Sequence, residues 1–129
     1  MNPSHVTNLD LSKALFEAGI TKDYESEFYW VENTAIGSKD PAHGKVKPRS
    51  TCCMLNGKVT SSGCIKYTPS LLATELMGFL PWCQLSRNGE DWYVHTPDNS
   101  FVGSSPIAPL SDLATYLLRE GKFNKPTTK

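Results

Sequence analysis

Three segments of the chain place apolar residues at helical spacing, and each ends at a glycine or proline that stops a helix. They span residues 9–19, 68–81 and 110–121. In the third segment, leucine and alanine recur at positions i, i+3, i+4, i+7 and i+8, which is the pattern of a helix with one buried face. We therefore predict three short amphipathic helices.

Residues with good capping chemistry stand near the predicted helix starts. Asn8 or Asp10 is expected to cap the first helix, since short polar side chains accept hydrogen bonds from the free N–H groups there. Thr68 followed by Pro69 is expected to open the second helix, because proline is well suited to the first helical position. Ser111 is the predicted cap of the third helix.

Segments rich in aromatic and β-branched residues lie between these helices. Residues 27–32 carry apolar side chains on both faces of an extended chain, so we predict a central strand there. Asn56-Gly57 and Asn88-Gly89 each separate two strand-like segments, and this dipeptide strongly favours a hairpin turn. Residues 61–63 interrupt the strand that returns from the first hairpin, and residues 100–103 are predicted to form an edge strand.

Together these elements predict one α+β domain spanning residues 1–129. Its architecture is expected to be a mainly antiparallel sheet of about five strands covered by three short helices. A chain of 129 residues has the usual size of a single domain. Residues 124–129 are polar and are expected to form a frayed tail.

Residues 34–50 are the least regular part of the chain. They contain two glycines and two prolines, so we expect neither a helix nor a strand to run through them. One interpretation is a solvated surface loop. The alternative is a clamp for the phosphates of a ligand, because four cations stand here against the single Asp40. These cations are Lys39, Lys45, Lys47 and Arg49.

Charge and hydropathy exclude two classes of partner. Thirteen basic and thirteen acidic residues cancel, and bulk binding of nucleic acid needs a surplus of Lys and Arg. No apolar run approaches the ~20 residues of a membrane-spanning helix, so we expect no membrane interaction. The first residues show no basic and apolar signal sequence, which predicts a cytoplasmic protein.

The four cysteines predict half-buried, reduced thiols rather than a metal centre. They form no Cys-x-x-Cys pair, and a cytoplasmic compartment keeps thiols reduced. The alternative is a zinc site that uses Cys52 or Cys53 together with Cys64 and a histidine, although the spacing is irregular for such a site. We expect neither a metal nor a cofactor.

The chain contains none of the common phosphate-loop, metalloprotease or serine-hydrolase motifs. His95 is the one histidine on a predicted strand, and as a general base it would need a partner such as Asp91, Asp98 or Cys83. Three aromatic residues add surfaces on which a nucleotide base could stack beside the cations of residues 34–50. The predicted ligand-binding residues are therefore Lys39, Lys45, Lys47, Arg49, Tyr29, Trp82, Trp92 and His95.

Three segments resemble small proteins from phages and prophage regions of gut bacteria, which form a phage α/β sandwich domain family. They are Glu27-Phe28-Tyr29-Trp30-Val31, Glu75-Leu76 leading to Leu80-Pro81, and Leu113-Ala114 leading to Leu117-Leu118-Arg119-Glu120-Gly121. The likeness fades over residues 37–63. It implies a phage-encoded accessory protein with a sheet covered by helices, acting in the cytoplasm of the bacterial host. The family carries no assigned activity, so no functional residue is carried over from it.

Three functional hypotheses follow. The first is a non-enzymatic phage-type accessory protein that binds a host or phage protein. The second is a protein that sequesters a nucleotide-type signalling ligand in anti-defence. The third is a small hydrolase that uses His95. Pairing of sheet edges between two copies would make a homo-oligomer, although nothing in the sequence requires one.

Overall fold

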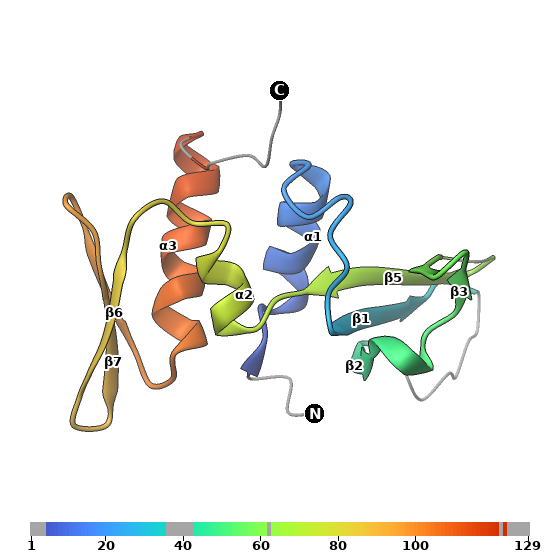
Figure 1. Cartoon of the computed structure of the whole chain (residues 1–129), viewed down its shortest axis with the longest axis horizontal. Coiled ribbons are helices and arrows are strands. Elements are labelled where there is room, and N and C mark those ends of the chain that lie inside the picture. The colour runs from blue at the N-terminus through green and yellow to red at the C-terminus, as the bar shows by residue number, and fades with distance from the viewer. Residues whose placement is uncertain (1–4, 36–42, 62, 122, 124–129) are drawn as a thin grey trace.

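The helices form a middle layer between two small antiparallel sheets (Figure 1). The structure is a computed structural model that describes residues 5–35, 43–61, 63–121 and 123. In this part of the chain, no helix is both long and apolar enough to cross a membrane. The helices are α1 (Leu9–Glu17), α2 (Ala73–Met77) and α3 (Ile107–Glu120).

The described strands belong to three antiparallel sheets. The first has the order β2-β1-β5, the second has the order β6-β7-β8, and β3 and β4 form a short hairpin. This confirms the predicted α+β class, but the strands are divided between small sheets rather than joined in one sheet of about five. Their bounds are β1 (Phe28–Asn33), β2 (Lys45–Pro48), β3 (Met54–Leu55), β4 (Lys58–Val59), β5 (Ile65–Ser70), β6 (Gln84–Asn88), β7 (Asp91–His95) and β8 (Ser100–Gly103).

The main core lies between the helices and the inner face of the β6-β7-β8 sheet. The apolar stripe of α3 faces this core, as its helical spacing predicted, and α3 begins three residues earlier than expected. Side chains from α1, α2 and β7 complete the cluster, so one core joins elements that are far apart in the sequence. Its buried members are Leu11, Leu15, Ile20, Leu71, Leu76, Leu80, Val94, Ile107, Leu110, Leu113, Ala114 and Leu117.

The central strand β1 is buried on both faces, as predicted. On one face the Trp30 indole Nε1 donates a hydrogen bond of 2.8 Å to the backbone carbonyl of Thr7, just before α1. On the other face Tyr29 and Val31 form a second, smaller core with Cys52 and Tyr67. The alternation of side chains along β1 therefore links two separate packing layers.

The second helix differs from the prediction, because Thr68 and Pro69 lie in β5. There they pair with Trp30 and Tyr29 of β1. β5 is an edge strand, where a proline interrupts no ladder, so pairing with β1 overrides the local helix signal. α2 begins only at Ala73, and its start is capped by Glu75, whose carboxylate accepts a 2.8 Å hydrogen bond from the Leu72 N–H.

The prediction of an irregular segment over residues 34–50 is wrong for its second half. Residues 45–48 form β2, which pairs with β1 in the register Trp30↔Val46. Gly44 adopts a φ of 76° just before β2, and its N–H donates to the Val31 carbonyl at 2.7 Å. Pro48 is accommodated at the end of this edge strand. Residues 36–42, with Lys39, and the predicted tail 124–129 lie outside the described residues.

The residues predicted to begin or end helices and turns are confirmed in part. The Asn8 side chain caps α1 by accepting a 2.8 Å hydrogen bond from Leu11 N–H, and Gly121 ends α3 with a φ of 68°. Ser111 is not a cap but lies inside α3, because the helix starts at Ile107. Asn56 and Gly57 both have positive φ, as a type I′ turn requires.

The second hairpin and the last strand also form. Asn88 pairs with Asp91, so the central turn residues are Gly89 and Glu90, one position later than expected. Residues 100–103 form the edge strand β8, as predicted, and the described residues 60–61 and 63–64, between β4 and β5, belong to neither strand.

Candidate functional site

The structure does not bring the predicted cations and the two tryptophans into one site. Lys45, Lys47 and Arg49 belong to β2 and the 3-10 turn that follows it, beside the first sheet. Trp82, Trp92 and His95 lie in or next to the β6-β7-β8 sheet, and the helix layer separates the two sheets (Figure 1). The predicted combination of stacking rings and cations is therefore not assembled from these residues.

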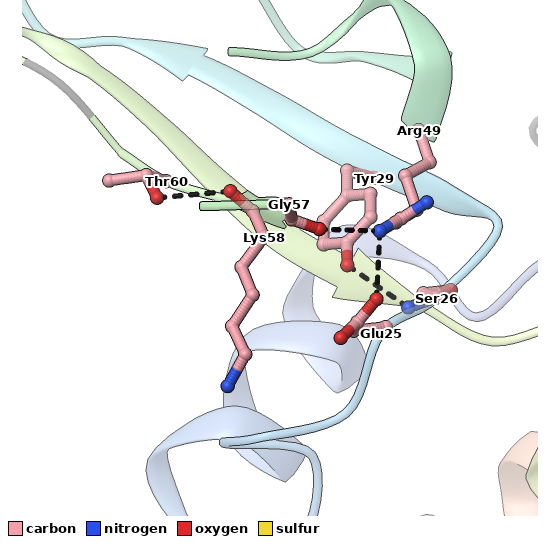
Figure 2. A network of polar contacts seen from close by, with 7 residues as sticks. All are labelled: Glu25, Ser26, Tyr29, Arg49, Gly57, Lys58 and Thr60. Atoms are coloured by element: carbon pink, nitrogen blue, oxygen red, sulfur yellow. Dashed lines mark hydrogen bonds and ion pairs between the residues drawn. The ribbon is translucent and has the colours of Figure 1, made fainter. Parts of the chain in front are cut away.

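Tyr29 and Arg49 meet in a polar network on the first sheet (Figure 2). The Arg49 Nη2 donates to Glu25 Oε1 at 2.8 Å and to the Gly57 carbonyl at 2.7 Å. The Tyr29 ring is only 4% exposed, and its phenol oxygen accepts a 3.0 Å hydrogen bond from the Ser26 N–H. Arg49 thus ties the loop before β1 to the β3-β4 hairpin, and Tyr29 offers no open face for stacking.

Lys45 and Lys47 stand on the Tyr29 side of the first sheet. Their backbone positions pair with Val31 and Tyr29, respectively. Lys45 is exposed and Lys47 is half-buried. They therefore add positive charge to this face, although neither lines either of the cavities described below.

All four cysteines are free thiols in the structure. Cys52 is buried in the smaller core, Cys83 is half-buried, and Cys53 and Cys64 are exposed. Burial raises the pKa of the Cys52 and Cys83 thiols, which favours their protonated form. In the described part of the chain, no group of three or more His, Cys, Asp or Glu side chains could hold a metal ion. The zinc alternative therefore finds no support there.

His95 lies exposed on the outer face of β7. Its ring stacks on Tyr93, with centroids 6.1 Å apart, and its Nδ1 lies 2.9 Å from the Ser100 Oγ. Ser100 was not among the predicted site residues, and the pairing of β7 with β8 places it directly opposite His95. A histidine within hydrogen-bonding distance of a hydroxyl group can act as the base that activates a nucleophile. Here both residues are exposed on an open face of the sheet.

Trp92 is half-buried, and one face of its ring is already occupied. The Arg87 guanidinium lies 5.6 Å from the ring centroid, in a cation–π contact across the β6-β7 pair. This contact explains the position of Trp92 without a ligand.

Trp82 borders a cavity of about 310 Å³, which we call the Trp82 cavity. Its side chain is 68% exposed, an unusual state for so large an apolar ring. Three separate segments form the walls, so no local sequence signal could have revealed this cavity. The residues that line it are Pro81, Trp82, Thr96, Pro97, Asp98, Asn99, Leu113, Tyr116 and Leu117.

A second cavity, of about 300 Å³, lies against the Tyr29 face of the first sheet. The loop after α1 and the strand that returns from the β3-β4 hairpin line it, so we call it the hairpin cavity. The sequence did not predict this site, because Lys22 and Lys58 lie outside the basic segment 34–50. Its lining residues are Phe16, Lys22, Asp23, Tyr24, Glu25, Tyr29, Lys58, Val59, Thr60, Ser61, Tyr67 and Pro69.

No protein family, curated protein or solved structure matches this chain. The resemblance to phage proteins therefore stays an expectation from the sequence.

Proposed function

We propose that this chain is a non-enzymatic phage-type accessory protein that acts by binding a protein partner at the Trp82 cavity. The observation that carries the proposal is a tryptophan, 68% exposed, at the edge of a cavity of about 310 Å³. Exposed tryptophans beside well-formed pockets are typical of the residues that dominate protein–protein affinity. The phage-type part of the proposal rests on the sequence resemblance.

The lining of the Trp82 cavity favours an apolar anchor from the partner. Leu113 and Leu117 of α3, which belong to the buried core, form an apolar floor, and Tyr116 adds an aromatic wall. A leucine or phenylalanine side chain entering this cavity would be removed from water together with the Trp82 ring. Burial of apolar area is the main favourable term in such contacts.

The charge of the rim favours a basic neighbour for that anchor. Asp98 is the one charged side chain among the described lining residues, and no cation lines the cavity. A partner segment with a lysine or arginine next to its apolar anchor would complement this carboxylate. The same charge disfavours a phosphate group here, so a nucleotide is not the ligand proposed for the Trp82 cavity.

Part of the rim is held in place before any partner binds. The Thr96 N–H donates to the Asn99 carbonyl at 2.8 Å, and the Asn99 N–H donates to Thr96 Oγ1 at 2.9 Å. The opposite wall belongs to α3, whose apolar stripe is anchored in the main core. A preorganised site loses less conformational entropy on binding, which favours affinity.

Replacing Trp82 with alanine is expected to weaken partner binding strongly without unfolding the protein. An interface tryptophan of this kind contributes about 2–4 kcal/mol, or roughly 30-fold to 1,000-fold in Kd. The immobilised protein would capture its partner from a host lysate, and Kd would then be measured by interferometry with the purified partner. The Asp98→Lys variant is expected to weaken the same complex by charge repulsion.

The matched control is Leu55→Ala, because Leu55 is 62% exposed but lies in the β3-β4 hairpin. This variant should keep wild-type affinity. Equal losses for Trp82→Ala and Leu55→Ala would contradict a role for the Trp82 cavity. Unchanged affinity in Trp82→Ala would contradict it as well.

A further inference from the structure

The hairpin cavity is lined by two lysines and two carboxylates, and the fold does not use the ammonium groups of the lysines. Among the described residues, neither Lys22 nor Lys58 makes an ion pair or hydrogen bond through its ammonium group. Figure 2 shows Lys58 reaching away from the Arg49 network toward the ribbon of α1 and the loop after it. Glu25 is neutralised by Arg49 at 2.8 Å, which leaves Asp23 as the one carboxylate of the lining without an ion pair in the described chain.

Two hydroxyl groups of the lining add unused donors. The Tyr29 phenol oxygen accepts from the Ser26 N–H, and the Ser61 Oγ accepts from the Tyr67 N–H at 3.0 Å. Neither hydroxyl donates to an acceptor in the described part of the chain. Burial raises the pKa of Tyr29, so its phenol keeps its proton at neutral pH. Ammonium and hydroxyl donors together favour a ligand rich in acceptor oxygens, such as a phosphate.

Aromatic side chains provide the apolar part of the same cavity. Phe16 and Tyr24 line it and are each only half-buried. Tyr24 is fixed by a 2.8 Å hydrogen bond to Glu75 and by an edge-to-face contact with Phe79, with centroids 5.0 Å apart. A ring held in this way is a stacking surface that loses little entropy when a base packs on it.

We infer that the hairpin cavity binds a mononucleotide, with its base against Phe16 and Tyr24 and its phosphate at Lys22 and Lys58. The volume of about 300 Å³ is at the lower end for small-molecule sites, which suits one nucleotide rather than a dinucleotide. The site is independent of the Trp82 cavity, because the two share no lining residue. Failure of either proposal therefore leaves the other standing.

Calorimetric titration of the whole protein with three probes tests both parts of the inferred ligand. AMP carries the ring and the phosphate, adenosine carries the ring alone, and inorganic phosphate carries the anion alone. We expect AMP to bind at least about tenfold more tightly than either fragment, since charge-assisted hydrogen bonds and stacking each add to affinity. No heat with millimolar AMP, or equal affinity for AMP and one fragment, would overturn the inference.

Two substitutions of opposite expected sign test the location. Lys58→Ala is expected to weaken AMP binding about tenfold by removing one charge-assisted contact. Asp23→Asn is expected to strengthen it, because the remaining carboxylate repels a phosphate. The matched control is Lys66→Ala, which removes the same charge from an exposed lysine of β5 that does not line the cavity.

Lys66→Ala should leave AMP binding unchanged, and circular-dichroism melting should show that all three variants keep the fold. Equal losses in Lys58→Ala and Lys66→Ala would indicate general charge attraction and overturn the assigned site. Weaker AMP binding in Asp23→Asn would also overturn it.

Discussion

Replacing Leu110 with alanine is expected to lower the free energy of unfolding by about 2–5 kcal/mol. Leu110 has no exposed surface, and it lies in the core that joins α1, α2 and α3 to the inner face of the β6-β7-β8 sheet. The variant loses the transfer free energy of the removed methyl groups and leaves a cavity that several elements surround. Because these elements constrain one another, we expect little collapse and a cost toward the upper part of the range.

Urea unfolding at neutral pH, followed by circular dichroism, measures this loss. Leu55→Ala is again the matched control, since it deletes the same atoms from a side chain that is 62% exposed. That control should change the free energy of unfolding by less than about 0.5 kcal/mol. Similar urea midpoints for the two variants would show that the core does not lie where the structure places it.

Gly103→Ala is expected to destabilise the protein by about 1–3 kcal/mol, although it adds only one methyl group. A Cβ atom built on Gly103 would lie 2.5 Å from the Ala108 Cβ and 2.9 Å from the Pro109 Cδ. Both neighbours belong to the first turn of α3, and the proline ring has no rotamer that moves it aside. The strand and the helix must therefore separate, which weakens the packing of α3 on β8.

Thermal unfolding of Gly103→Ala would measure this effect, with Ser104→Ala as its control. Ser104 is exposed and follows Gly103 directly in the chain, so its loss should leave the melting temperature nearly unchanged. The backbone of Gly103 does not have a positive φ, so the expected cost is steric and not conformational. A stabilised Gly103→Ala protein would contradict the close approach of β8 and α3.

The two proposed binding sites have different chemistry. The Trp82 cavity combines an apolar and aromatic wall with a polar rim that carries one carboxylate and no cation among the described lining residues, whereas the hairpin cavity has two lysines, two carboxylates, hydroxyl donors and aromatic walls. A protein segment suits the first and a phosphorylated small molecule suits the second. The first proposal keeps the hypothesis of a protein partner. The second keeps the nucleotide hypothesis but shares only Tyr29 with the residues predicted for it.

The candidate residues show how far a sequence can identify a site. Trp82 was identified as a candidate, and it borders a cavity, but the leucines opposite it were interpreted only as core positions of a helix. Tyr29 and Arg49 were expected to face a ligand. Arg49 instead pairs with Glu25, and the ring of Tyr29 is buried while its hydroxyl, which accepts from the Ser26 N–H, lines the hairpin cavity. His95 was expected to pair with an acid or a thiol, and strand register placed Ser100 against it.

The sequence by itself determined the α+β class, the central strand around Trp30, the Asn56-Gly57 turn, the start of α1 and the C-terminal end of α3. These features depend on contacts within a few residues, such as the Asn8 cap and the positive φ of Gly121, or on a regular apolar period. Only the tertiary structure decided that residues 45–48 and 68–70 pair with β1, and that distant segments enclose two cavities. Pairing with a buried strand outweighs local propensity, and no short stretch of sequence records which segments will meet.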